Sequence, residues 1–288
     1  MSLLRIHHRT TYRYTAPVQF GLHRLVLRPR EGHRTTVRCH QITISPQATL
    51  SWMTDIFGNH IALAEIHDRA AELVVDNLVE LDIHDGRPDP GAVQQAGCST
   101  VTLPAAWLQY EQEVAAAYAV SSWQNEACQI TEWMHSLARP AGMSAAAVME
   151  SITATVHSRI KYRRREEPGV QSPVTTLNLG TGSCRDMATL ALEAARALGL
   201  AARFVSGYLH SSASSAGQGA THAWVEVYLP DSGWTAFDPT TGGAAGSRHI
   251  PLGVSCHPRG VMPISGTFDS HTGTSLGMTV SLTIRDSA

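Results

Sequence analysis

The sequence predicts an α+β protein in which a β domain precedes a core of helices and antiparallel strands. The first hundred residues are short β-prone runs separated by breakers, and residues 104–162 then show helical spacing. A helix beginning near Cys184 is followed by strongly alternating strands. We therefore expect an N-terminal β domain at 1–100, a helical segment and catalytic core at 101–246, and a C-terminal segment at 247–288 that returns as a strand.

Composition excludes several classes of partner. The chain has 288 residues, of which 43% are hydrophobic, so it can bury a substantial core. With 22 basic and 24 acidic residues its formal charge is −2, which provides no field to attract nucleic acid or anionic lipid. No stretch approaches the run of about 18 apolar residues that spans a membrane. We expect neither nucleic acid nor membrane as a partner, and the oligomeric state stays open.

Cysteine and histidine positions do not predict a metal site or a disulfide framework. The five cysteines are an odd number without C-x-x-C spacing, which fits a reduced, cytoplasmic location. The 15 histidines are scattered without an H-E-x-x-H motif. The sequence therefore predicts no metal and no cofactor. The basic run 163–165 is followed at once by two glutamates, so we interpret it as a solvated face.

The N-terminal region contains a series of predicted strands. The first runs from Leu4 to Tyr14, and further strands cover 22–27 and 37–44. The Gly58-Asn59 pair, flanked by apolar residues, predicts a hairpin. Residues 73–75 and 78–83 are expected to form a strand pair before a loop of breakers at 85–90.

Helices are expected next. The apolar spacing predicts helices over 105–120 and 127–138, and a third over 145–159 capped by Ser144. Residues 168–179 are expected to be a loop that carries Thr175 and Thr176 and helps to wall a cleft.

The helix after residue 183 places a cysteine at its first position. Ser183 and Asp186 have the spacing of a capping box, and Gly199 is placed to end the helix in a left-handed conformation. A thiol at Cys184 would lie beside unpaired N–H groups and the positive end of the helix dipole, which favour the thiolate. The alternative is that Cys184 is only a small buried hydrophobic residue.

Strands follow at 202–208, 221–229 and 234–238, with a Ser/Gly/Ala-rich loop at 211–219 that we expect to be mobile. In the second strand His222 shares a face with Trp224, Glu226 and Tyr228. A four-residue turn would pair Leu229 with Trp234, which leaves Asp238 about three residues from the position opposite His222. A bulge or register shift would make these two side chains neighbours.

Cys184, His222 and Asp238 supply the residue types of a nucleophile, a base and an orienting carboxylate, in that order along the chain. Each has an alternative explanation, because a strand histidine is often structural and an aspartate before Pro239 suits an Asx turn. Their joint occurrence on a helix–strand–strand frame favours the catalytic interpretation.

At these residues the chain resembles the transglutaminase-like superfamily, and within it the bacterial branch named for candidate cysteine proteases. The similarity lies in 182–188 (GSCRDMA), 221–228 (THAWVEVY) and 233–240 (GWTAFDPT). Residues 8–59 resemble the β domain that precedes the core in this branch, and His249-Ile250 also fits its pattern. The resemblance implies a papain-like core with Cys184, His222 and Asp238 as the triad. Two departures are Met187 in place of phenylalanine and the absence, in 254–259, of the acidic residues that the family usually has just after His249-Ile250.

The expected chemistry is acyl transfer through a Cys-His-Asp triad on a peptide or carboxamide. With water as acceptor the protein is a protease or amidase, which the resemblance favours; with an amine it is a transglutaminase. An inactive binding or scaffold module and a redox thiol protein are the remaining alternatives. Tyr162 and Thr175–Thr176 are candidates for a second oxyanion donor beside the Cys184 N–H.

Overall fold

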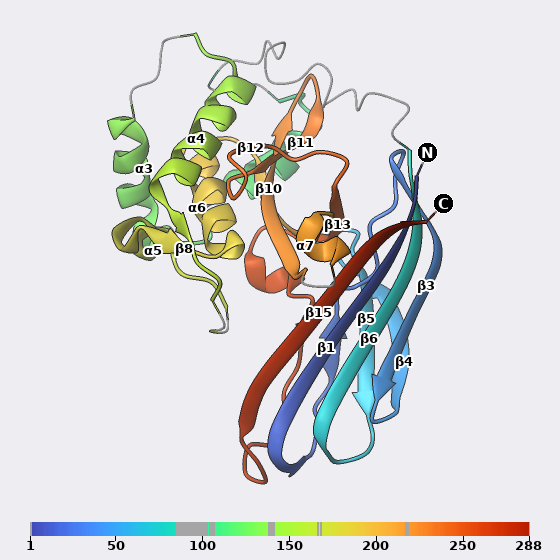
Figure 1. Cartoon of the computed structure of the whole chain (residues 1–288). Coiled ribbons are helices and arrows are strands. Elements are labelled where there is room, and N and C mark those ends of the chain that lie inside the picture. Colours follow the sequence, from blue (N-terminus) through green and yellow to red (C-terminus); the bar gives the residue numbers. More distant parts are fainter. Residues whose placement is uncertain are drawn as a thin grey trace.

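The computed structural model describes residues 2–84, 103, 107–137, 142–165, 167, 169–216 and 219–287. Long strands form one part of the molecule and helices packed on a five-stranded sheet form the other, so the predicted α+β fold is confirmed (Figure 1). The breaker loop expected at 85–90 lies outside the described residues.

A four-stranded antiparallel sheet of order β15-β1-β6-β3 joins the two ends of the chain. It consists of β1 (Ser2–Val18), β3 (Thr35–Ser45), β6 (Ala70–Ile83) and β15 (Ser275–Ser287). The strand pair expected at 73–75 and 78–83 is wrong. These residues form one strand, because Asp76 and Asn77, which resemble a turn locally, pair with Arg9 and His8 of β1.

A second sheet, of order β14-β2-β5-β4, contains the predicted hairpin. Its strands are β2 (His23–Leu25), β4 (Ala48–Thr54), β5 (His60–Ile66) and β14 (Ile264–Ser265). Asp55 Oδ1 accepts hydrogen bonds from the N–H groups of Phe57 and Asn59, both at 2.9 Å, and Gly58 has φ +73°. The side chain of Asp55 therefore closes the turn, and a positive φ explains the glycine.

The helical segment partly differs from the expectation. It contains α2 (Gln112–Ala119), α3 (Ala127–Ser136) and α4 (Ala145–Arg159), and the Ala147 N–H donates to the predicted cap Ser144. The first helix begins later than expected, and residues 105 and 106 lie outside the described part. Residues 173–179 are not a loop but α5 (Pro173–Leu179), because Ser172 caps it, Pro173 suits its first turn and Gly180 ends it at φ +61°.

Helix α6 (Cys184–Ala197) is the centre of the main hydrophobic core. Its apolar residues, among them Met187, Leu190 and Ala194, share this core with alternate residues of β10 (Thr221–Leu229). Gly199 ends the helix with φ +74° as expected. The helix is nevertheless buried on most sides, since α2, α3, α4 and α5 also contact it. Even Glu193 and Arg196 are buried, and they pair with each other at 2.8 Å. The rigid packing of α6 fixes the position of its N-terminus.

The sheet beside α6 has the order β12-β11-β10-β9-β13. Its other strands are β9 (Ala202–Leu209), β11 (Gly233–Asp238), β12 (Gly243–Ala244) and β13 (His249–Ser255). Residues 212–215 of the expected 211–219 loop form a single helical turn, α7, and residues 217 and 218 lie outside the described part.

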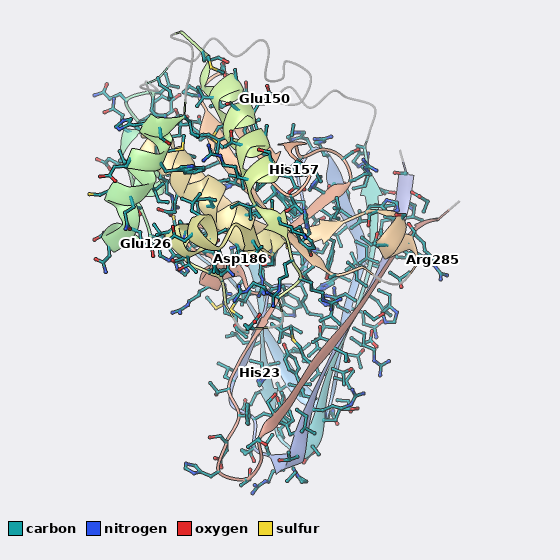
Figure 2. The ribbon with its side chains drawn as sticks, turned by 60° about the vertical axis from the view of Figure 1, so that its left-hand side comes forward. His23, Glu126, Glu150, His157, Asp186 and Arg285 are labelled. Carbon is teal, nitrogen blue, oxygen red and sulfur yellow. The ribbon has the colours of Figure 1, made fainter. Side chains whose placement is uncertain are left out.

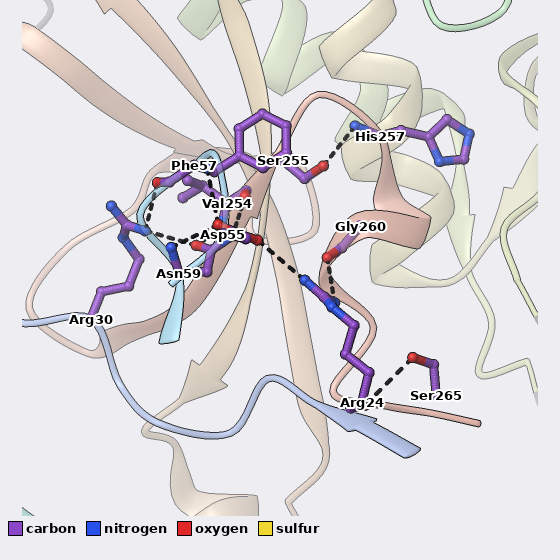
Figure 3. Close-up of polar contacts among 10 residues, drawn as sticks. All are labelled: Arg24, Arg30, Asp55, Phe57, Asn59, Val254, Ser255, His257, Gly260 and Ser265. Atoms are coloured by element: carbon purple, nitrogen blue, oxygen red, sulfur yellow. Dashed lines mark hydrogen bonds and ion pairs between the residues drawn. The ribbon is translucent and has the colours of Figure 1, made fainter. Parts of the chain in front are cut away.

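The two parts of the molecule share a core and a polar contact. Apolar residues of β1, β6 and β15 pack on Tyr208, Ile250 and Leu252 of the five-stranded sheet. Asn59, at the end of the hairpin turn, donates to the Val254 carbonyl at 2.8 Å and accepts from the Val254 N–H at 2.9 Å (Figure 3). Because Asn59 is fully buried, each of these bonds stabilises the contact by about 1 kcal/mol. The hairpin thereby supports β13.

Candidate active site

Cys184 is the first residue of α6, as predicted, and its side chain lies in the core with 8% of the residue exposed. The predicted capping box is present: Asp186 Oδ2 accepts from the backbone N–H and the hydroxyl of Ser183, both at 2.8 Å. The same carboxylate accepts from the Arg165 guanidinium at 3.0 Å and the Gln171 N–H at 2.7 Å. Asp186 therefore holds the preceding segment, through Arg165 and Gln171, against the start of the helix. Figure 2 shows Asp186 and His157 in the helical part and His23 among the long strands.

The register between β10 and β11 decides whether the side chains of His222 and Asp238 lie on the same face of the sheet. The structure pairs Leu229 with Gly233 and Val225 with Phe237, one residue tighter than the expected pairing of Leu229 with Trp234. Continuing this ladder sets Asp238 opposite Trp224, on the sheet face that also carries His222. His222 Nε2 and Asp238 Oδ2 lie 2.9 Å apart. The expected register would have directed the carboxylate to the opposite face.

Cys184, His222 and Asp238 are thus brought together from α6, β10 and β11. Since Nε2 of His222 contacts Asp238, Nδ1 is the ring nitrogen left for the thiol, and the Cys184 side chain interacts with this imidazole. Glu226, the other carboxylate on the His222 face, pairs instead with Arg203 at 2.6 Å and does not serve as an orienting group.

The pKa shifts of His222 and Asp238 favour an ion pair between these two side chains. Burial by itself would lower the pKa of His222, but hydrogen bonds and negative charge from Asp238 and Cys184 raise it to about 10. Burial would raise the pKa of Asp238, yet hydrogen bonds from His222 and His249 hold it well below its ordinary value. The carboxylate is therefore ionised and the imidazole protonated at neutral pH.

His249 is the site residue that the sequence interpretation left without a role. It lies at the start of β13, and its Nε2 is 3.0 Å from Asp238 Oδ2. Its ring packs edge-on against Trp224, with centroids 5.1 Å apart. The contact joins His249 on β13 to Asp238 on β11, so no local pattern in the sequence could predict it. The one sequence signal was that His249-Ile250 fits the pattern of the family that the chain resembles.

The nitrogen and oxygen ligand atoms of His222, Asp238 and His249 lie within 4.8 Å of one another, which raises the question of a metal site. A metal on His249 Nε2 would place the ring proton on Nδ1. That atom already faces the Gly246 N–H at 3.1 Å, so two donors would oppose each other. Metal-bound histidines normally donate through their second nitrogen to an acceptor. The geometry therefore favours a hydrogen-bond network.

The residues suggested as second oxyanion donors differ in whether their hydroxyl groups are free to donate to a substrate. Thr176 is buried and its hydroxyl donates to the Ser172 carbonyl at 3.0 Å, while Thr175 lies in α5 and accepts from the Ser172 hydroxyl. Tyr162 is half-exposed in β7 (Lys161–Tyr162), paired with Gly182 of β8 (Thr181–Gly182). Burial and the nearby charge of Cys184 raise the pKa of this phenol, so its proton is retained. Tyr162 is the better placed of the two candidates.

Whole-chain relatives are similar but their names state no activity. The chain is 28% identical to the uncharacterized protein Rv2569c of Mycobacterium tuberculosis, covering 91% of this chain and 86% of that one. It is 25% identical to the uncharacterized protein ML0607 of Mycobacterium leprae, covering 97% and 98%. In the described residues, no helix is both long and apolar enough to cross a bilayer.

Structure and family comparisons agree with the fold. A crystal structure from Cytophaga hutchinsonii, named as a candidate cysteine protease, matches with a TM-score of 0.72 at 14% identity, covering 100% of this chain and 92% of that one. Residues 4–82 match the bacterial transglutaminase-like N-terminal region, and residues 131–239 match the transglutaminase-like superfamily. The chain thus combines a bacterial transglutaminase-like N-terminal region with a core that belongs to the transglutaminase-like superfamily.

Proposed function

We propose that the protein catalyses acyl transfer from a peptide or carboxamide through Cys184, with His222 as acid and base and Asp238 as the orienting carboxylate. The observation that carries the proposal is the contact of His222 with both other side chains, Asp238 at 2.9 Å and the thiol of Cys184. The likeness in fold to a protein named as a candidate cysteine protease supports hydrolysis over transfer to an amine.

In the first half of the reaction the Cys184 sulfur bonds to the substrate carbonyl carbon, and the carbonyl electron pair moves onto oxygen. The Cys184 N–H, in the first turn of α6 where intrahelical acceptors are absent, donates to this oxyanion, with Tyr162 as the second donor. When the oxyanion collapses, the C–N bond breaks and the His222 imidazolium gives its proton to the leaving amine.

In the second half, water attacks the thioester, and His222 takes the proton of that water. The C–S bond then breaks, which releases a carboxylic acid and restores the thiolate–imidazolium pair. Asp238 keeps its negative charge throughout and holds the imidazole in place. We propose a cytoplasmic location, supported by the four described cysteines, Cys39, Cys128, Cys184 and Cys256, all being free thiols.

The acyl acceptor is tested by incubating the protein with a peptide library that includes glutamine-containing peptides, with and without a fluorescent primary amine. We expect new carboxyl termini or deamidated side chains, and little amine adduct. Lys161 is the one lysine of the chain, so the side-chain amines of the protein itself compete little with the added amine for the acyl-enzyme. Predominant incorporation of the amine would instead establish transglutaminase activity, and the Cys184→Ala variant controls for uncatalysed cleavage.

A further inference from the structure

Two histidines share one oxygen of the Asp238 carboxylate. Oδ2 contacts Nε2 of His222 at 2.9 Å and Nε2 of His249 at 3.0 Å, while Oδ1 accepts from the Thr240 N–H at 2.8 Å. Asp238 is fully buried. A buried carboxylate requires several donors to remain ionised, so His249 has an electrostatic function at this position.

The tautomer of His249 follows from its other ring nitrogen. The Gly246 N–H donates to Nδ1 at 3.1 Å, so Nδ1 is the acceptor and the ring proton lies on Nε2. The His249 N–H donates in turn to the Gly246 carbonyl at 2.9 Å, which closes a turn around the ring. Neutral His249 therefore directs an N–H at Asp238 Oδ2 without needing a positive charge.

We propose that His249 is a positioning residue, whose Nε2–H orients the Asp238 carboxylate so that His222 is presented to Cys184. This inference rests on the proposed function. Among the described residues, the titratable groups that face the Asp238 carboxylate are His222 on β10 and His249 on β13, and Cys184 on α6 faces His222. His157 of α4 contacts the following turn through the Thr240 carbonyl at 2.9 Å.

A pair of substitutions separates the N–H from the bulk of the ring. His249→Gln keeps an N–H donor within reach of the carboxylate, whereas His249→Leu fills similar space without one. We expect His249→Leu to lower the rate of Cys184 alkylation by iodoacetamide at pH 5–6 about tenfold, since a shift of one pKa unit changes the thiolate fraction tenfold. His249→Gln should recover most of this rate, and kcat on a cleaved peptide should fall in parallel with little change in KM.

Three outcomes would overturn the positioning role: a wild-type alkylation profile in His249→Leu, equal losses in both variants, or an effect on KM alone. Unfolding midpoints of the two variants verify that both are folded. The alkylation profile requires no substrate. If all variants lack turnover but the profile shifts as expected, the positioning role holds and the proposed reaction fails.

Discussion

Replacing Cys184 by alanine is expected to abolish turnover, with a loss of about a thousandfold or more, because no other described group can form the acyl-enzyme. Unfolding free energy should change by no more than about 1 kcal/mol, since only one sulfur atom leaves a site that is 8% exposed. Cys256→Ala is the matched control, because Cys256 is a partly buried free thiol outside the site. Peptide cleavage and labelling by iodoacetamide at pH 6 are the measurements.

His222→Ala should remove turnover to a similar extent and slow alkylation of Cys184 near neutral pH, because the thiolate loses its imidazolium partner. Asp238 keeps its contacts with His249 and the Thr240 N–H, so the carboxylate does not become an unpaired buried charge. Wild-type rates in either the Cys184 or the His222 variant would contradict the triad.

Asp238→Asn is expected to lower kcat roughly 10²–10⁴-fold, because a neutral amide stabilises the His222 imidazolium much less than a carboxylate. In wild type, activity should persist until pH rises through the His222 pKa of about 10, where the imidazolium proton is lost. In the variant this alkaline limb should move toward the ordinary value of 6.5. The thiolate fraction of Cys184 below neutrality should fall as well.

Stability has a matching pH dependence in wild type. The raised pKa of His222 contributes stability that is fully present below pH 6.5 and is lost as pH rises through about 10. The lowered pKa of Asp238 contributes stability that is present above its ordinary 3.8 and is lost as pH falls through its folded value. Asp238→Asn should weaken both dependences.

Asp231→Asn, on the exposed turn of the same β10–β11 hairpin, is the control for a charge change that leaves the site intact. Activity and alkylation are followed across pH, and urea midpoints are compared at pH 4, 6.5 and 9. A wild-type profile in Asp238→Asn would mean that Asp238 only closes the turn, through its carbonyl bonds to Thr241 and Gly242.

Local sequence was sufficient where neighbouring residues decide the conformation. Ser183, Asp186 and Gly199 set the start and end of α6, so the position of Cys184 at a helix N-terminus could be predicted. The Gly58-Asn59 turn and the alternation along β10 follow from the same short-range rules. These features require no knowledge of the rest of the fold.

Local rules failed where the boundary of an element or the pairing of a strand depends on a small difference in free energy. Ser172, Pro173 and Gly180 were signals for α5, but seven residues between breakers also suit a loop. Asp76-Asn77 resembles a turn until β1 supplies its partners. In both cases the energy difference between the local alternatives is small, and packing decides between them.

Only the tertiary structure decided the arrangement of the site. Leu282 pairs with His8 at the other end of the chain, a partner that no local pattern specifies. A single-residue difference in the β10–β11 register determines whether Asp238 lies on the His222 face, because side chains alternate across a strand. His249 reaches the same carboxylate from β13, two strands away from β10. The sequence determined which residues could carry the chemistry, whereas their contacts depend on strand pairings between distant segments, which cooperative packing of the whole fold selects.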